Sequence, residues 1–181
     1  MNAIGLVEFK SIARGIAAAD IMVKTAAVEL LAANPICPGK YMALVAGDVA
    51  AVQSAVQAGV QAGGQAVLDE LILPNVHPSV FPAITATSQV DELQALGIIE
   101  TFTVASLIIA ADASAKAAEV QLIEIRLAAG LGGKSYVTMT GDVAAVKSAV
   151  EAGTQRVASQ GLLVDSVVIP SPSKLLKKAI L

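Results

Sequence analysis

The most chemically reactive side chain of this sequence is its single cysteine, Cys37. It lies in Pro35-Ile-Cys-Pro-Gly-Lys40, where Pro38 and Gly39 suit the two central positions of a type II turn. A residue that precedes proline is driven to an extended conformation, so Cys37 is predicted at the tip of a loop. Free cysteines are usually buried, which makes a thiol at a loop tip a candidate ligand or redox group.

One thiol per chain leaves two interpretations of Cys37 open. A single cysteine cannot close a disulfide within the chain, and one thiolate cannot hold an iron–sulfur cluster by itself. A cyclic trimer would bring three copies of Cys37 to a single axis and supply such a site. The simpler interpretation is an exposed, unreactive thiol.

The other candidate side chains do not form a recognisable catalytic site. His77, the only histidine, has no Gly-x-Ser-x-Gly motif beside it in the sequence, so we expect it to make hydrogen bonds in a loop. Gly130-Leu-Gly-Gly133 precedes a predicted strand and not a helix, which favours a tight turn over a nucleotide-binding loop. Glu8 and Glu100 recur at equivalent strand ends and are interpreted as structural. The sequence therefore predicts a protein that is not an enzyme.

These residues belong to a chain that repeats itself. The segment Gly47-Asp-Val-Ala-Ala-Val-Gln-Ser-Ala-Val-Gln-Ala-Gly59 recurs 94 residues later, from Gly141 to Gly153, with 11 of 13 positions identical. Elsewhere the correspondence continues with an offset of 92 or 96. The 181 residues are therefore predicted to form two homologous domains, 1–80 and 95–181, joined by the segment 79–94.

Each copy reads as strand, helix, strand, strand, helix, strand. Ser11 and Thr103 precede the first helices, and Asp48 and Asp142 precede the second, where side-chain oxygens can accept backbone hydrogen bonds. A polar stripe is predicted along the second helix by glutamines spaced four apart, at Gln53, Gln57, Gln61 and Gln65. We predict an α+β fold of two tandem ferredoxin-like (split βαβ) domains, with antiparallel sheets and helices on one face. The other sheet face is expected to meet another subunit.

Composition and charge exclude several classes of protein. Basic residues number 12 and acidic residues 15, so we expect neither a nucleic-acid nor a membrane partner. Aromatic residues are 3% of the chain, with no Trp, which argues against a stacking platform. The uncharged stretches 49–68 and 71–90 contain glutamines or prolines, so neither is predicted to span a membrane. With no leader predicted, we expect a cytoplasmic protein.

With these motifs in place, the sequence resembles the tandem-domain shell proteins of bacterial microcompartments over nearly its whole length. The resemblance is carried by Ala3-Ile-Gly-Leu-Val-Glu8, by Asp20-Ile-Met-Val-Lys-Thr-Ala26 with its echo Asp112-Ala-Ser-Ala-Lys-Ala-Ala118, and by Gly47-Asp-Val-Ala-Ala-Val52 with its copy. Within the family, Pro35–Lys40 together with Val76-His-Pro-Ser-Val80 is most similar to the trimeric shell proteins of propanediol-utilisation compartments.

The resemblance implies a homotrimer that forms a pseudohexameric tile in the shell of a cytoplasmic microcompartment. It also implies a [4Fe-4S] cluster at the central pore, bound by Cys37 of three subunits, for electron transfer or cluster transport. The implied partners are other shell proteins and encapsulated redox enzymes. Lys24 and Lys116 match an edge lysine that packs across tile boundaries, the alternative being solvated helix charges. The implied pore loop consists of Pro35, Ile36, Cys37, Pro38, Gly39 and Lys40.

The chain departs from the family pattern at one place. Many members end the fourth strand with Pro-Arg-Pro-His, where this sequence has Pro74-Asn-Val-His77 and Pro170-Ser-Pro-Ser173, both without the arginine. The tail Lys174–Leu181 is predicted to form a short basic terminal helix. Two alternative functions stay open: a shell tile with a plain metabolite-conducting pore and no cluster, and a free-standing trimeric ligand-binding regulator.

Overall fold

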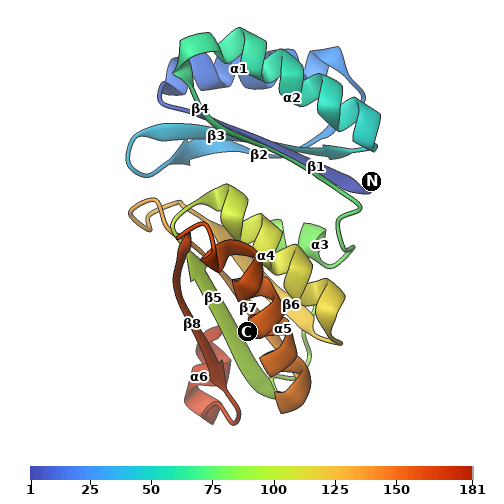
Figure 1. Ribbon diagram of the computed structural model, residues 1–181, viewed down its shortest axis with the longest axis vertical. Coiled ribbons are helices and arrows are strands. Elements are labelled where there is room, and N and C mark those ends of the chain that lie inside the picture. Colours follow the sequence, from blue (N-terminus) through green and yellow to red (C-terminus); the bar gives the residue numbers. More distant parts are fainter. Residues whose placement is uncertain (181) are drawn as a thin grey trace. The chain divides into compact units, whose positions relative to one another are not determined.

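The computed structural model describes residues 1–180, and Leu181, the last residue of the predicted tail helix and second domain, lies outside the described residues. The chain divides into two compact units (Figure 1). The first comprises residues 1–76 with 129–133, and the second comprises residues 77–128 with the chain from 134 onward. The residue limits predicted for the two domains, 1–80 and 95–181, stay a prediction.

The first unit contains a four-stranded antiparallel sheet covered on one face by two helices, α1 and α2 (Figure 1). The strands follow the order β2-β3-β1-β4 across the sheet. Its elements are β1 (Ala3–Phe9), α1 (Ile12–Thr25), β2 (Glu29–Ile36), β3 (Lys40–Gly47), α2 (Val49–Gly63), the 3₁₀ helix η1 (Gly64–Ala66) and β4 (Val67–Pro74).

The second unit repeats this arrangement, with strand order β6-β7-β5-β8 and the long helices α4 and α5 on one face of the sheet. Its elements are α3 (Val80–Ile84), β5 (Ala95–Thr101), α4 (Val104–Ala117), β6 (Gln121–Leu127), β7 (Ser135–Gly141), α5 (Val143–Ala158), β8 (Leu163–Ile169) and α6 (Lys174–Ile180). The prediction of an α+β fold with two ferredoxin-like domains is confirmed. The short helix α3, in the segment that joins the repeats, was not predicted.

A glycine in the central strand lets the second helix of each unit approach the sheet closely. A Cβ atom on Gly5 in β1 would lie 2.5 Å from the Val56 side chain of α2. The same atom on Gly97 in β5 would lie 2.8 Å from Val146 of α5. Because real Cβ atoms do not approach carbon this closely, these contacts explain why the repeat keeps glycine at both positions.

The first helix of each unit begins with the predicted side-chain cap. Ser11 and Thr103 accept hydrogen bonds from the backbone amides three residues later, at 3.4 and 3.2 Å. Each interaction satisfies one of the amides that the first helical turn leaves without an intrahelical partner.

The predicted capping by the second pair of residues is wrong. Asp48 and Asp142 are the N-cap residues of α2 and α5, but in the described chain neither side chain accepts an amide hydrogen bond. Their backbone carbonyls accept the first helical hydrogen bonds, and their carboxylates lie at the positive end of the helix dipole. Their contribution is therefore electrostatic.

Helix surfaces differ between the units. The glutamine stripe of the first unit is exposed, as predicted, with Gln65 lying in η1 beyond the end of α2. In the second unit the terminal helix α6 packs Leu176 and Ile180 against a cluster that includes Leu96 and Ile123. Leu96 lies in the central strand β5, so α6 packs against the sheet of this unit in addition to the long helices α4 and α5.

Candidate functional site

Cys37 begins a three-residue turn between β2 and β3. Ile36 pairs with Lys40 in the antiparallel ladder, which leaves Cys37, Pro38 and Gly39 as the turn. The peptide bond between Cys37 and Pro38 is cis, and Gly39 has a φ of 77°. This left-handed conformation is the one that the Pro-Gly pair predicted for its glycine. The Cys37 thiol is free and half-buried.

The turn is shorter than the predicted pore loop. Pro35 and Ile36 were assigned to the loop, but they belong to β2, where Pro35 pairs with Tyr41. Lys40 likewise begins β3, and Ile36 is 4% exposed. The predicted loop of six residues therefore contains three turn residues and three residues that the sheet holds in register.

A glycine-rich segment lies beside the Cys37 turn within the first unit. Residues 129–133 belong to this unit, and a Cβ atom on Gly133 would lie 3.3 Å from the Cys37 carbonyl oxygen. Gly130, Gly132 and Gly133 all have positive φ, between 64° and 92°. The strand β7 follows, so the interpretation of this segment as a tight turn agrees with the structure.

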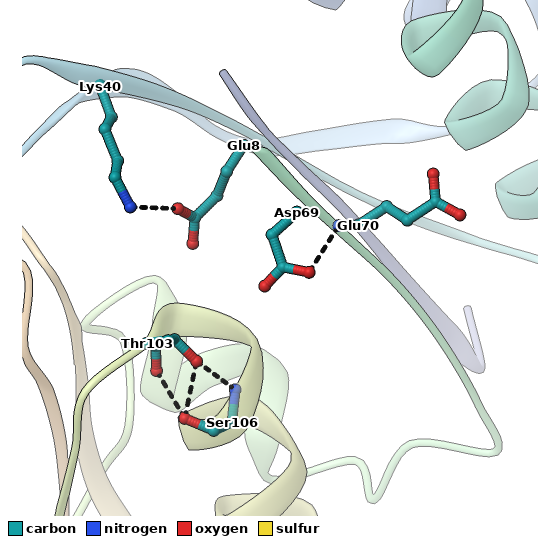
Figure 2. A network of polar contacts seen from close by, with 6 residues as sticks. All are labelled: Glu8, Lys40, Asp69, Glu70, Thr103 and Ser106. Atoms are coloured by element: carbon teal, nitrogen blue, oxygen red, sulfur yellow. Dashed lines mark hydrogen bonds and ion pairs between the residues drawn. The ribbon is translucent and has the colours of Figure 1, made fainter. Parts of the chain in front are cut away.

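Lys40, at the base of the Cys37 turn, is paired with a buried carboxylate (Figure 2). Its ammonium nitrogen lies 3.4 Å from Glu8 Oε2 in β1. Burial raises the pKa of the Glu8 carboxyl above its usual 4.5; Lys40 opposes this shift and the nearby Asp69 carboxylate adds to it. The pair therefore joins the central strand to the Cys37 turn.

The second unit repeats this ion pair. Lys134, which immediately precedes β7, lies 2.6 Å from Glu100, near the end of β5. In each repeat the lysine lies two residues before the residue that pairs directly with the glutamate on the neighbouring strand. Each ion pair therefore connects two adjacent strands diagonally. Because the corresponding turn of the second repeat has no cysteine, the repeated pair agrees with a structural interpretation of Glu8 and Glu100.

The two candidate edge lysines lie in the last turns of equivalent helices. Lys24 pairs with Asp20 in α1, and Lys116 pairs with Asp112 in α4, each at 2.6 Å. The lysine side chains are 71% and 43% exposed, respectively. Neither ion pair involves a residue of the Cys37 turn.

His77 makes the loop hydrogen bonds that the sequence led us to expect. Its ring nitrogen Nδ1 lies 2.8 Å from the Ser79 hydroxyl, and its backbone amide donates to Asp112 Oδ1 at 2.8 Å. Asp112 therefore has two partners, the His77 amide and the Lys116 ammonium. His77 acts here as an anchor for the chain that enters the second unit.

A cavity of about 470 Å³ on the second sheet was missed by sequence reasoning. Tyr136 donates a hydrogen bond to Glu124 at 3.0 Å, and Arg126 lies 2.8 Å from the same carboxylate. Burial, followed by the effect of Glu124, raises the pKa of the Tyr136 hydroxyl. Only the strand register brings these residues together, because Tyr136 pairs directly with Arg126 across β6 and β7. The first unit has no equivalent cluster, since its matching positions hold Ala32, Asn34 and Met42.

Two further observations limit the chemistry of a single copy. Within residues 1–180, no three His, Cys, Asp or Glu side chains lie close enough to hold a metal ion together. None of the helices in the described part of the chain is long and apolar enough to cross a membrane.

Comparison with known proteins identifies the repeat. The BMC domain family matches twice, at residues 3–76 and 95–172. The chain is 46% identical to the bacterial microcompartment shell protein PduT of Citrobacter freundii over 171 residues, which cover 94% of this chain and 93% of that protein. It is also 42% identical over 80 residues to the shell protein EutM of Salmonella typhimurium, covering 44% of this chain and 81% of EutM.

A solved structure agrees with this assignment. The crystal structure of a microcompartment protein from Desulfitobacterium hafniense superposes with a TM-score of 0.96 and 59% sequence identity. The superposition covers 98% of this chain and 99% of that one. The chain therefore belongs to the bacterial microcompartment shell protein family, with two tandem BMC domains, and is a structural protein and not an enzyme.

Proposed function

We propose that three copies of this chain form a pseudohexameric tile whose central pore carries a [4Fe-4S] cluster bound by Cys37 of each copy. The tile lies in the shell of a microcompartment in the cytoplasm, and the cluster passes electrons, or is itself transported, across that shell. The observation that carries this proposal is the position of the single thiol in the three-residue turn between β2 and β3.

The donor set of the chain fits a shared cluster. Iron–sulfur clusters are held by cysteine thiolates, and one chain supplies a single thiol. A three-fold axis through the turn would supply three ligands and leave one iron for a ligand from elsewhere. The space around Gly39 supports this arrangement, since a Cβ atom there would meet nothing within 4 Å. When bound, the cluster supplies one-electron redox chemistry.

The residues around Cys37 hold the turn in place. Gly39 adopts the left-handed conformation that closes the turn, and the Ile36–Lys40 pairing fixes the two strand ends. The Glu8 carboxylate restrains Lys40, so its ammonium is held toward β1. A thiol on a fixed turn needs less ordering when a cluster binds than one on a flexible loop.

The test uses protein purified without oxygen, as the native chain and as Cys37→Ala. We expect an iron–sulfur absorption band and a paramagnetic signal after reduction, with about one cluster per three chains, in the native protein only. Sedimentation of both proteins provides the control, because loss of the cluster must occur without loss of the trimer. Iron binding that survives in Cys37→Ala would contradict the assignment of the ligand.

The alternatives predict different results in the same experiment. A tile without iron after attempted reconstitution, which still forms sheets, would be a plain metabolite pore. A discrete trimer that never forms sheets at high concentration would be a free-standing regulator. Support for the tile comes from family membership, because the relatives PduT and EutM are both named bacterial microcompartment shell proteins.

The proposed partners follow from the same model of function. Neighbouring shell proteins would meet the tile at edges that contain Lys24 and Lys116, whose side chains are exposed. Redox enzymes inside the compartment would exchange electrons with the cluster. The absence of the family's arginine near residues 74–77 and 170–173 leaves the edge contacts to other side chains.

A further inference from the structure

We propose that the cavity between α6 and the second sheet binds a small neutral molecule with several hydroxyl groups, a monosaccharide or a sugar alcohol. The inference goes beyond the proposed tile and does not depend on the trimer or the cluster, because every residue that lines the cavity belongs to the second unit. It is drawn from the polar side chains of β6 and β7, from a buried hydroxyl without a partner, and from a comparison with the first repeat.

The cavity lies on the face of the second sheet opposite α5. A Cβ atom on Gly153 of α5 would lie 2.6 Å from the Ile99 side chain of β5, so Ile99 faces this helix. Because side chains alternate along a strand, Ile98 and Glu100 project to the other face, where they line the cavity. The last turn of α6 forms the wall on the other side of the cavity.

Strand pairing arranges the polar side chains of this face in two rows. In the first row, Tyr136 of β7 pairs with Arg126 of β6 and with Glu100 of β5. In the second row, Thr138 of β7 pairs with Glu124 of β6. Side chains of both rows line the cavity, whose volume of about 470 Å³ lies within the range of about 300–1,000 Å³ that is usual for small-molecule sites.

The Thr138 hydroxyl indicates that the cavity receives a polar ligand. Thr138 is 7% exposed, and its Oγ1 atom has no hydrogen-bond partner among the described residues. A buried hydroxyl without a partner is destabilising, and folded proteins rarely keep one unless water or a ligand satisfies it. Because Thr138 lines the cavity, a hydroxyl group of a bound ligand can supply the missing partner.

The fold does not require polar side chains at these positions. In the first sheet, Leu44 pairs with Ala32 at the place where Thr138 pairs with Glu124 in the second sheet. Leu44 is fully buried, so an apolar residue packs well at this position of the fold. Since the sheet forms with an apolar pair here, the polar pair of the second repeat is available for binding.

The charges around the cavity favour a neutral ligand over an ion. Glu124 is paired with Arg126 at 2.8 Å, and Glu100 is paired with Lys134 at 2.6 Å, so two acids and two bases balance each other. A bound anion or cation would compete with one of these pairs and leave a partly buried charge without its partner. A neutral hydroxyl group can bind without breaking either pair.

A hydroxyl group both donates and accepts hydrogen bonds, and the cavity offers partners of both kinds. Tyr136 and Arg126 each contact one carboxylate oxygen of Glu124, and each oxygen keeps a lone pair that can accept from a ligand. Arg126 has further N–H groups that can donate, and the Thr138 hydroxyl can do either. The Glu124 side chain is 30% exposed, so a ligand can reach it from solvent.

The experiment uses the fluorescence of Tyr136 to report on the cavity. The sequence contains two tyrosines and no tryptophan, so Tyr136 is the only tyrosine left in the full-length variant Tyr41→Phe. Because its hydroxyl is bonded to Glu124, a ligand that enters the cavity should change its emission. This variant is titrated with glucose, which is a ring, and with sorbitol, which is an open chain. We expect a saturable change with at least one of them.

Thr138→Val, made in the Tyr41→Phe background, removes the hydroxyl and nearly keeps the shape of the side chain. We expect it to weaken binding about tenfold. The midpoint of urea denaturation should stay the same or rise, because no hydrogen bond within the protein is lost. A threonine with a merely structural role would lower this midpoint.

Thr154→Val in the same background is the matched control. Thr154 lies on α5, and its hydroxyl donates to the Glu151 carbonyl of that helix. Since Thr154 does not line the cavity, this variant should leave binding within about twofold.

Acetate and methylammonium test the class of ligand. Neither ion should produce a saturable change in the Tyr136 emission, and binding of an ion in place of the neutral probes would overturn the assignment to a hydroxylated molecule. No saturable change with either glucose or sorbitol would overturn the proposed site, as would equal affinity with and without the Thr138 hydroxyl. These outcomes leave the proposed trimer and cluster to their own tests.

Discussion

The Glu8 carboxylate and the Lys40 ammonium, 3.4 Å apart, form an ion pair in which the acid is almost wholly buried and the base is partly exposed. The Glu8 side chain is 4% exposed and that of Lys40 is 36% exposed. Burying a carboxylate is costly unless it is compensated, and Lys40 is the cation that compensates it. This one contact therefore contributes to the stability of the first sheet and to the position of Lys40 beside the Cys37 turn.

Glu8→Gln should change how stability depends on pH. Because the folded pKa of Glu8 is raised above 4.5, the folded state binds this proton more tightly than the unfolded state. The resulting stability is fully present below pH 4.5 and is lost as the pH rises through the folded pKa. In urea denaturation at fixed chain concentration, the native chain should lose free energy of unfolding relative to Glu8→Gln across this window. Parallel pH profiles would contradict the prediction.

Lys40→Met should be more destabilising at neutral pH than Glu8→Gln. Removing the cation leaves a charged carboxylate buried without its partner, whereas removing the acid leaves a lysine that is partly exposed to solvent. The measurement is the midpoint of urea denaturation for the two variants at pH 7. Equal midpoints would show that Lys40 does not compensate the burial of Glu8.

Gly39→Ala should strain the Cys37 turn and reduce cluster retention. An alanine at a φ of 77° costs about 1 kcal/mol, although the space around it is open. Gly161→Ala is a matched control, because Gly161 has a φ of 68° and open space but lies in the second unit. Both should lower stability by similar amounts, and only Gly39→Ala should speed the loss of iron on dilution. Equal rates of iron loss from the two variants would show that the conformation of the Cys37 turn does not affect cluster retention.

Ser11→Ala should cost more stability than Asp48→Ala. The Ser11 hydroxyl accepts an amide hydrogen bond, so its loss should cost about 1 kcal/mol. The Asp48 side chain makes no such bond in the described structure and acts through the helix dipole, which is worth about 0.5 kcal/mol. Thermal denaturation of both variants at low and high salt checks this, since only the Asp48 effect should weaken with salt.

Lys24→Ala and Lys116→Ala should impair sheet formation while trimers persist. Each lysine is exposed and joined only to an aspartate of its own helix, so its removal leaves the helix packing intact. Electron microscopy of concentrated protein measures the extent of sheets, and sedimentation measures the trimer. If the double variant Lys24→Ala/Lys116→Ala formed sheets as extensively as the native chain, these lysines would not contribute to contacts between tiles.

The repeat made the order of elements and the fold class predictable, because the same helix and strand patterns occurred twice. Ser11 and Thr103 as caps followed from local chemistry, in which a hydroxyl reaches an amide three residues away. Asp48 and Asp142 occupy similar positions by sequence, yet in the described structure their side chains accept no hydrogen bond from a helix amide. Local patterns thus place the helix starts but do not determine every interaction there.

Side-chain contacts between strands could not be predicted from the sequence because they depend on the register in which the strands pair. The length of the Cys37 turn follows from the Ile36–Lys40 pairing, which a proline at position 35 made difficult to anticipate. The cluster of Glu124, Arg126 and Tyr136 likewise requires the exact offset of β6 against β7, including the irregularity after Leu122. The burial of Glu8 depends on tertiary packing as well as on its place in the strand.

The glycine-rich turn of the second repeat has an evolutionary consequence. In a ring of six identical single-domain chains, a cysteine in the turn would be present six times, and no member could lose it alone. Two tandem copies in one chain can differ at equivalent positions, and here one turn reads Gly130-Leu-Gly-Gly133 while the other holds the thiol of Cys37. In the proposed trimer the axis would therefore carry three thiols, whereas a ring of six identical single-domain chains would carry six or none.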